Sequence, residues 1–362
     1  MITFESVTKQ YPGGTTAVDD LELEVPDGEV VVLVGPSGCG KTTILRMVNR
    51  MIEPSDGRIV VNGQDIMRTS PPQLRRGIGY VIQGIGLFPH RRIEDNIATV
   101  PRLEGWDGDR IKARVDELVE TVGLPEDVRG RYPHQLSGGQ QQRVGVARAL
   151  AVDPPIMLMD EPFAAVDPIV RTRLQDEFLR LQSEVRKTIV FVTHDIDEAI
   201  KMGDRIAILS QGGTLEQYAT PEDLLAEPAN DFVADFLGAE RGLKRLALIP
   251  VSQVQAVPGP VVRPGTGAQD ARRVAAEFGD DWVAVVDDEG RTHGWARVDD
   301  LDGGSLDGVE LRDFELAVRA DDSLRAALNA LVISRHGVAV RLGDGDRYEG
   351  LLTRELLTEE LG

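Results

Sequence analysis

The nine-residue stretch GPSGCGKTT, residues 35–43, constrains the fold more than any other part of the chain. It fits the pattern Gly-x-x-x-x-Gly-Lys-Ser/Thr, with Gly35, Gly40, Lys41 and Thr42 at the fixed positions. The apolar run before it, VVVLV, predicts a strand buried on both faces, and the run after it predicts a helix. A glycine loop between strand and helix lets backbone N–H groups surround a phosphate chain at the positive end of the helix. We therefore expect a nucleoside triphosphate site, with Lys41 facing the β- and γ-phosphates and Thr42 offering its hydroxyl to Mg²⁺.

Length and composition narrow the possible classes of protein. A chain of 362 residues, 41% of them hydrophobic, is expected to form about two or three domains with real cores. The net charge of −20 argues against a nucleic-acid-binding surface. Cys39 is the single cysteine, so we expect no intrachain disulfide, a reducing compartment and a packing role for Cys39. No apolar run approaches the ~20 residues of a membrane span, so we expect a cytosolic protein unless a partner holds it at a membrane.

Polar residues follow three further apolar runs that we interpret as strands. Gln83 ends the run 77–83, Asp160 and Glu161 follow IMLM, and His194 follows TIVFVT. A carboxylate at the carboxyl end of a buried strand is the expected second Mg²⁺ position, and its neighbour Glu161 is placed to deprotonate a water. His194 would contact the γ-phosphate. The alternatives are an ordinary strand-exit turn at Asp160 and a structural histidine.

Two other segments suggest ligand contacts. Tyr11 precedes a Pro-Gly-Gly turn, where its ring is available to stack on an adenine or is simply an exposed loop residue. Ser137-Gly138-Gly139 precedes a helical run, residues 140–151, so its bare backbone donors form either a second anion site or a plain helix cap. Elsewhere we expect strands at 2–7 and 58–61, a turn at 62–63 and an amphipathic helix at 108–123.

In this order and spacing, these segments resemble the ATPase subunit of ATP-binding cassette (ABC) transporters. The matching residues are 35–43, Gln83, LSGGQ at 136–140, IMLMDE at 156–161, Asp167 and His194. The resemblance covers about residues 1–238 and implies an α/β ATPase domain at 1–240, with a core and a helical lobe at about 84–150. It also implies a head-to-tail homodimer, in which each ATP lies between Lys41 of one chain and Ser137–Gln140 of the other.

The same resemblance assigns roles to individual residues. Glu161 would be the base, His194 the γ-phosphate sensor and Lys41 the catalytic cation, while Mg²⁺ would be held through Thr42, Gln83 and Asp160. The expected ATP-contacting residues are Tyr11, Gly35, Pro36, Ser37, Gly38, Cys39, Gly40, Lys41, Thr42, Thr43, Gln83, Ser137, Gly138, Gly139, Gln140 and Asp167. One departure is AAVD at 164–167, where the family usually has SALD.

A narrower resemblance rests on residues 80–106, YVIQGIGLFPHRRIEDNIATVPRLEGW. This stretch is similar to the subfamily that imports quaternary amines such as glycine betaine, choline, carnitine and proline betaine. It implies a membrane permease as partner, an extracytoplasmic substrate-binding protein acting indirectly, and a place at the cytoplasmic face of the membrane. The apolar residues 85–90 would lie near the groove that receives a permease helix, or would pack locally between lobes. Importers of other small solutes remain an alternative, as does a soluble ABC protein without a transport role.

The last third of the chain repeats itself after an expected linker at 241–257. Val262 corresponds to Val318, Ala271 to Ala327, Val283 to Val338 and Gly294 to Gly350, so the offset is 55 or 56 residues. Each unit predicts strand, helix, strand, turn and strand. The two units, 258–303 and 311–360, resemble a tandem pair of cystathionine-β-synthase-type (CBS) modules, which often bind adenine nucleotides.

The ligand positions of such modules are incomplete here. The first unit has Asp300 but Arg297 in place of the usual threonine, and the second has Thr353 but Leu356 in place of the usual aspartate. A nucleotide or cyclic-dinucleotide sensor and a pair that only packs and dimerises therefore both stay open.

Overall fold

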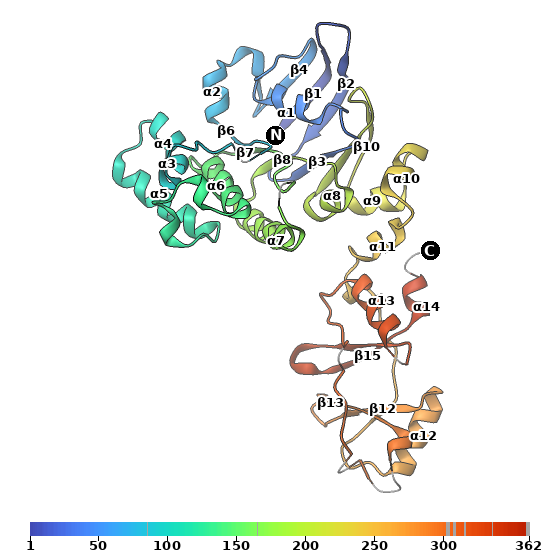
Figure 1. The fold of residues 1–362 in the computed structure, drawn as a ribbon. Helices are drawn as coiled ribbons and strands as arrows, with labels where there is room; N and C mark the ends of the chain where they lie inside the picture. The colour runs from blue at the N-terminus through green and yellow to red at the C-terminus, as the bar shows by residue number, and fades with distance from the viewer. Residues whose placement is uncertain are drawn as a thin grey trace. The chain divides into compact units, whose positions relative to one another are not determined.

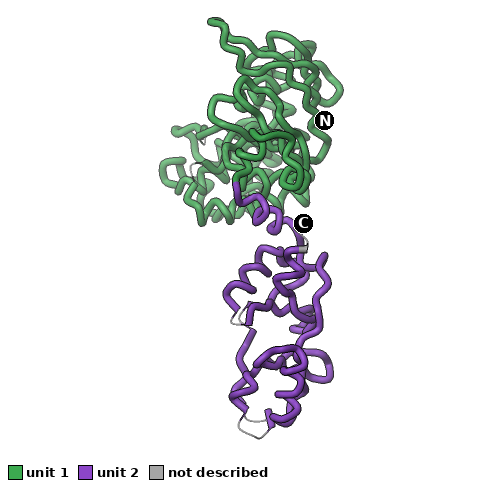
Figure 2. Tube along the Cα trace, turned by 90° about the vertical axis from the view of Figure 1, so that its right-hand side faces the viewer, with its two compact units in different colours: residues 1–238 green, residues 239–362 purple. Residues whose placement is uncertain are grey.

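The structure is a computed structural model of the chain. It describes residues 1–84, 86–164, 166–301, 305–306, 309–314, 316–334 and 336–359. The expected features at Ile85, at Ala165 and at the end of the first repeat (302–303) lie outside the described residues. The chain forms two compact units, Met1–Gly238 and Ala239–Gly362 (Figure 2), and each is described by itself. No helix in the described ranges is both long enough and apolar enough to cross a membrane.

The first unit is built on a six-stranded sheet with the strand order β10-β9-β3-β8-β7-β6 (Figure 1). Its strands are β3 (Val30–Val34), β6 (Ile78–Val81), β7 (Ile156–Asp160), β8 (Thr188–Val192), β9 (Arg205–Leu209) and β10 (Leu215–Ala219). All neighbours pair in parallel except β9 and β10. Every residue of β3, β7 and β8 is buried, which explains why these strands are apolar without alternation. The carboxyl ends of the parallel strands therefore meet at one edge of the sheet.

A second, antiparallel sheet has the order β2-β1-β4-β5. It contains β1 (Ile2–Gln10), β2 (Thr16–Val25), β4 (Asp56–Val61) and β5 (Gln64–Asp65). The expected turn after β4 is present, with Asn62 and Gly63 both at positive φ, as a tight hairpin requires. Helix α1 (Lys41–Val48) buries Ile44, Leu45 and Met47 in the core that both sheets share.

Helices dominate residues 93–150 of the first unit, the green region at the left of Figure 1. They are α3 (Ile93–Ile97), α4 (Thr99–Leu103), α5 (Gly108–Thr121) and α6 (Gly138–Leu150). The predicted amphipathic helix is α5, which buries Val115, Leu118 and Val119. Helix α6 starts two residues before the predicted run because Ser137 caps it. Strand β6 ends at Val81, so Gln83 lies in the loop after it rather than on the strand.

The remaining helices of the first unit follow strands or connect them. They are α2 (Pro71–Arg76), α7 (Pro168–Val185), α8 (Ile196–Met202), α9 (Pro221–Ala226) and α10 (Asp231–Leu237). Helix α7 is capped by Asp167 and helix α8 by Asp195, so each helix begins right after a strand-exit loop.

The second unit contains the predicted order of elements twice. The first copy has β11 (Val261–Val262), α12 (Ala268–Phe278), β12 (Trp282–Val286) and β13 (Thr292–Arg297). The second has a bridge at Val318, then α13 (Leu324–Ile333), β14 (Ala339–Leu342), β15 (Tyr348–Leu352) and α14 (Arg354–Glu359).

Strand pairing fixes the register of the repeat. Val262 pairs with Val285, and Val318 with Arg341, so both equivalent positions are 56 residues apart. Because Val285 faces Gly294 and Arg341 faces Gly350, the same offset holds along both hairpins. The structural counterpart of Val283 is therefore Ala339, and the sequence match to Val338 was wrong by one residue.

The two faces of each hairpin pack differently. In the first copy, Val283 and Val285 pack against α12, whereas Trp282, Ala284 and Val286 point to the other face. There they meet Val340, Leu342 and Leu351 of the second copy in one shared core. The period-two alternation thus gives each copy its own core and joins both copies through a third.

Residues 241–257 differ from the expected linker. They form helix α11 (Arg241–Leu246) and a short 3₁₀ turn, Val251–Gln253. Leu246, Ile249, Val251 and Val254 are buried in the core of the second copy, so this stretch is an integral part of the second unit. Its apolar residues are spaced too irregularly to match a helix or strand period, which explains the missed prediction.

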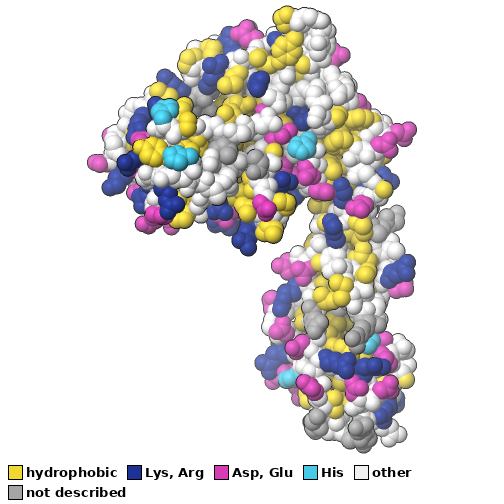
Figure 3. Space-filling model, in the orientation of Figure 1, with side chains coloured by type: hydrophobic (Ala, Val, Ile, Leu, Met, Phe, Trp, Pro, Cys, Tyr) yellow, Lys and Arg dark blue, Asp and Glu magenta, His cyan; other side chains and the backbone are white. Residues whose placement is uncertain are grey.

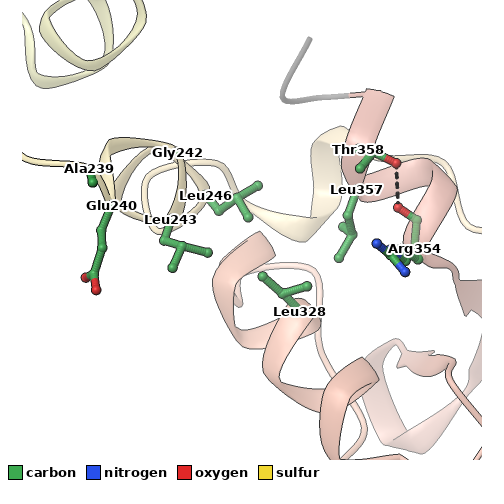
Figure 4. A pocket seen from close by; sticks show the side chains of 9 residues that line it. All are labelled: Ala239, Glu240, Gly242, Leu243, Leu246, Leu328, Arg354, Leu357 and Thr358. Atoms are coloured by element: carbon green, nitrogen blue, oxygen red, sulfur yellow. Dashed lines mark hydrogen bonds between the residues drawn. The ribbon is translucent and has the colours of Figure 1, made fainter.

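A pocket of about 330 Å³ opens among α11, α13 and α14 of the second unit (Figure 4). Its inner wall is formed by Leu246, Leu328 and Leu357, which point toward the space between the helices. The pocket is mainly apolar because of these leucines, although the charged residues Arg354 and Glu240 also line it.

Candidate active site

The phosphate loop joins β3 to α1 in a shape that only glycine permits at two positions. Gly35 has φ 155°, and a Cβ there would lie 2.1 Å from the carbonyl oxygen of Leu209. Gly40 has φ 99°, and a Cβ there would lie 2.2 Å from the carbonyl oxygen of Ala17. The two fixed glycines of the motif are thus required both by backbone conformation and by the close approach of neighbouring backbone.

Lys41 lies inside the curve of this loop. Its side chain is only 7% exposed, and Nζ donates hydrogen bonds to the carbonyl oxygens of Gly35 at 2.6 Å and Pro36 at 3.0 Å. Cys39 is fully buried with its Sγ 3.5 Å from the same Nζ. The loop therefore holds a full positive charge at the start of α1, which suits a phosphate chain.

Two oxygen ligands of the kind that Mg²⁺ prefers lie beside the loop. The Thr42 hydroxyl donates to Asp160 Oδ1 at 3.1 Å, and Asp160 at the end of β7 is 2% exposed. Burial raises the pKa of Asp160, the hydrogen bond from Thr42 opposes this shift, and the charge of Glu161 adds to it. In the described part of the chain, no three His, Cys, Asp or Glu side chains gather into a metal site. A Mg²⁺ ion held here would complete its shell with phosphate oxygens and water.

Glu161 stands next to Asp160 in an unusual backbone conformation. Its φ is 46°, in the left-handed region, and its N–H donates to the Val192 carbonyl oxygen of neighbouring β8 at 3.0 Å. Its carboxylate accepts a hydrogen bond from Gln83 Nε2 at 3.1 Å, and its other oxygen lies 3.2 Å from His194 Nδ1. The loops after β6, β7 and β8 thus bring three predicted residues together. A carboxylate held this way, 19% exposed beside a more exposed imidazole, has the chemistry of a general base for water.

Tyr11 lies at the edge of the phosphate loop, as expected. It follows β1 in the hairpin to β2, and its hydroxyl is 3.5 Å from Thr43 Oγ1. The ring is 37% exposed, and Lys9 Nζ lies 5.4 Å from its centroid. An exposed ring beside the loop is placed to stack on a base attached to the phosphates.

The segment 137–140 is not brought to this cluster. Ser137 and Gln140 form a reciprocal capping box at the start of α6, with Ser137 N–H donating to Gln140 Oε1 at 3.0 Å. In the described ranges, no hydrogen bond or ion pair joins residues 137–140 to the phosphate loop or to Glu161. Asp167 likewise caps α7 by accepting from Ile169 N–H at 3.0 Å. One chain therefore brings together the residues predicted for the phosphate, Mg²⁺ and base roles but leaves the predicted second anion site at 137–140 apart.

Comparisons with known proteins agree with this geometry. A family model described as ABC transporter matches residues 18–164. The osmoprotectant import ATP-binding protein OsmV of Salmonella typhimurium is 44% identical, over 100% of this chain and 96% of its own length. The carnitine transport ATP-binding protein OpuCA of Listeria monocytogenes is 43% identical, over 99% of this chain and 91% of its own length.

Solved structures match part of the chain. A dimeric structure of MJ0796, titled a bacterial ABC transporter cassette, has a TM-score of 0.56 at 33% identity and covers 61% of this chain and 99% of that one. A second dimeric MJ0796 structure, a post-hydrolysis state bound to ADP and Pi, has the same TM-score at 32% identity, with the same coverage. Two transport ATP-binding proteins are more than 40% identical to this chain over nearly their full length. The similar sequences and the similar solved structures thus indicate the same family. The chain belongs to the ABC transporter family of ATP-binding proteins.

Proposed function

We propose that this chain hydrolyses ATP to drive import of a quaternary-amine osmoprotectant through a separate membrane permease. The main support for hydrolysis is that the Glu161 carboxylate contacts both Gln83 and His194. This cluster lies next to the hydrogen-bonded pair of Thr42 and Asp160 and the loop that holds Lys41. In this proposal Lys41 and the loop residues hold the phosphates, Thr42, Asp160 and Gln83 serve Mg²⁺, and Glu161 deprotonates the attacking water.

The chain acts as a head-to-tail homodimer in this proposal. The start of α6 places the backbone N–H groups of exposed Gly138 and half-buried Gly139 in its first turn, and it lies apart from the phosphate loop of its own chain. A second copy is the natural source of the missing contact, with its Ser137–Gln140 closing over ATP held by Lys41. The dimeric state of the related MJ0796 cassette supports this arrangement.

The solute class rests on the similar proteins, whose names specify osmoprotectant, carnitine, choline and glycine betaine transport. We infer glycine betaine, choline, carnitine or proline betaine as cargo, a membrane permease as direct partner and a substrate-binding protein outside the membrane as indirect partner. The chain would then sit at the cytoplasmic face of the membrane.

Reconstitution tests the whole proposal. The chain and its permease, in liposomes with internal Mg²⁺-ATP, are expected to take up at least one labelled quaternary amine and to release phosphate. Uptake of only an unrelated solute would refute the cargo class, and lack of hydrolysis by the assembled complex would refute the enzymatic part.

We further propose that the repeats in residues 239–362 are a CBS pair that regulates the motor. Support comes from the constant 56-residue offset and from the core that both copies share. None of the proposed catalytic residues lies in this unit, so hydrolysis is expected not to need it.

Ionic strength is the favoured signal for this unit. At two positions where related modules hold a nucleotide, the side chains form ion pairs within the chain instead. Arg297 pairs with Asp281 and Asp300 pairs with Arg312, both at 3.2 Å. These pairs are about half exposed, and surface pairs of this kind weaken as salt screens them. Acidic and basic side chains are interspersed over the visible face of this unit in Figure 3. The mainly apolar pocket of Figure 4 suits a phosphate-bearing ligand poorly.

Truncation after Gly238, the boundary between the two units, tests the regulatory role. The truncated subunit is expected to keep basal ATPase activity but to lose the salt response of the assembled transporter. The assay compares both forms in liposomes across a salt series, with and without adenine nucleotides and cyclic dinucleotides. Identical response curves would leave the repeats an assembly role only.

A further inference from the structure

A histidine of the second copy is enclosed by side chains of the first copy. His336 lies in the turn between α13 and β14, and its side chain is 16% exposed. Its ring centroid is 5.3 Å from that of Trp282 on β12 and 5.0 Å from that of Trp295 on β13. The Arg312 guanidinium lies 5.0 Å from the centroid of the Trp295 ring. The imidazole therefore occupies the joint between the two copies.

The two ring nitrogens of His336 have different surroundings. Nδ1 lies 3.3 Å from Asp281 Oδ1, and because a carboxylate only accepts hydrogen bonds, Nδ1 carries the proton and donates. Nε2 is buried and has no hydrogen-bond partner among the described residues. A second proton, on Nε2, would thus be a buried donor without an acceptor, which is costly. The arrangement suits the neutral imidazole.

The charges around the imidazole partly cancel. Asp280 and Asp281 favour a positive charge on His336, whereas Arg297 opposes it. Arg297 Nη2 lies 3.2 Å from Asp281 Oδ2, so the nearest carboxylate is already paired with a cation. Burial outweighs the carboxylates and lowers the pKa of His336. The folded joint therefore holds its proton less tightly than a histidine in water.

We propose that His336 makes the joint between the two copies a pH-sensitive latch, which is closed while the imidazole is neutral and loosens when acid protonates it. A charged ring gains hydration by leaving the space between the two tryptophans. Trp282 also belongs to the core that both copies share, so movement of the ring loosens that core. An effect on hydrolysis rests on the proposed regulatory role of this unit, whereas the latch itself does not.

Tryptophan fluorescence of the full-length chain tests the latch directly. Trp106, Trp282 and Trp295 are the three tryptophans of the chain, so a Trp106→Phe background reports only on the two at the joint. Protonation of an imidazole beside an indole quenches its emission. We expect a single titration step with its midpoint below about 6.5, the ordinary pKa of histidine. His336→Gln should abolish the step, and His293→Gln, a half-exposed histidine in the same unit, is the matched control.

Asp281→Asn gives a second, directional test. Asparagine keeps an oxygen that accepts from Nδ1 but loses the negative charge, so the midpoint should move to lower pH. This variant leaves His336 in place, so the test stays decisive where His336→Gln fails to fold.

Hydrogen exchange shows whether protonation loosens the joint. The ratio of exchange rates in β12 and β14 between wild type and His336→Gln, at the same pH, cancels the intrinsic pH dependence. We expect this ratio to rise by up to about tenfold for each pH unit of acidification between about 6.5 and the lower pKa of the folded state.

Four outcomes would overturn the latch. They are the absence of a step in the wild type, the same step in His336→Gln, a midpoint above about 6.5, which would mean that the joint favours the charged ring, and an exchange ratio independent of pH. The regulatory role has its own readout, hydrolysis by the assembled transporter in liposomes across a pH series. A joint that titrates as expected, with identical pH profiles of hydrolysis in wild type and His336→Gln, would refute the regulatory role and not the latch.

Discussion

Replacing Glu161 with glutamine tests the assignment of the base most directly. In the wild type, the Glu161 carboxylate lies 3.1 Å from Gln83 Nε2 and 3.2 Å from His194 Nδ1. Glutamine has the same length, so its amide oxygen can still accept from Gln83 Nε2, while its amide nitrogen faces His194 Nδ1. The position of the side chain is thus preserved, and only the capacity to take a proton is removed.

The expected loss follows from the role of the group. A positioned general base contributes about 10²–10⁴-fold to a rate, equivalent to about 3–5 kcal/mol of activation free energy. Nucleotide binding should be nearly intact, because the Lys41 hydrogen bonds and the loop glycines do not involve Glu161. Dimers that bind ATP but hydrolyse it slowly are therefore expected to accumulate.

Phosphate release by the full-length variant measures the rate, and a fluorescent ATP analogue measures binding in parallel. Size-exclusion chromatography with ATP and Mg²⁺ detects the trapped dimer. Glu177→Gln, a carboxylate change on the outer part of α7, is the control. Hydrolysis near the wild-type rate in Glu161→Gln would show that Glu161 is not the base.

Three other changes have expected outcomes. Lys41→Ala removes charge-assisted hydrogen bonds to phosphate worth about 1.5–3 kcal/mol, so ATP affinity should fall roughly 10–100-fold by equilibrium binding, and unchanged affinity would disprove its role. Phe88 is 37% exposed, with the guanidinium groups of Arg91 and Arg148 at 4.9 and 5.8 Å from its ring. Phe88→Asp should therefore leave the fold intact but uncouple hydrolysis from uptake or release the permease; normal assembly and transport would leave only a packing role. For Glu198, burial raises the folded-state pKa above its unfolded value, so the folded wild type takes up a proton first as pH falls. Its stability relative to the non-titrating Glu198→Gln should therefore rise as the pH falls through the folded-state pKa and level off below the unfolded-state pKa, and a constant difference in thermal melts would contradict this.

The sequence predicted the central strands well because they are buried on both faces. Apolar runs such as 30–34 and 156–159 have no competing period, and in a parallel sheet the residues that follow them meet at one edge. That topology is why Gln83, Glu161 and His194 were predicted near one site although Gln83 and Glu161 are 78 residues apart in sequence.

Other features depend on contacts that a linear pattern does not contain. The start of α6 is set by the Ser137 cap. The register of the repeat is set by strand pairing, which makes Ala339 the position equivalent to Val283 in the second copy. The segment 241–257 folds only because the second copy offers a core for its irregular apolar residues. The Gln175–Glu198 pair was missed because each residue alone fits a polar helix surface. Only packing reveals that they are buried together.

The backbone hydrogen bond from Glu161 to Val192 makes the catalytic spacing a property of the sheet rather than of the loops. The left-handed conformation of Glu161 costs about 1–2 kcal/mol, and the neighbouring strand holds the residue in it. Insertions or deletions in the helical region or in surface loops leave this register unchanged. Over evolutionary time the surfaces proposed to meet a permease can therefore diverge without retuning the proposed hydrolytic centre, whereas a slip of β7 against β8 would separate Glu161 from His194 at once.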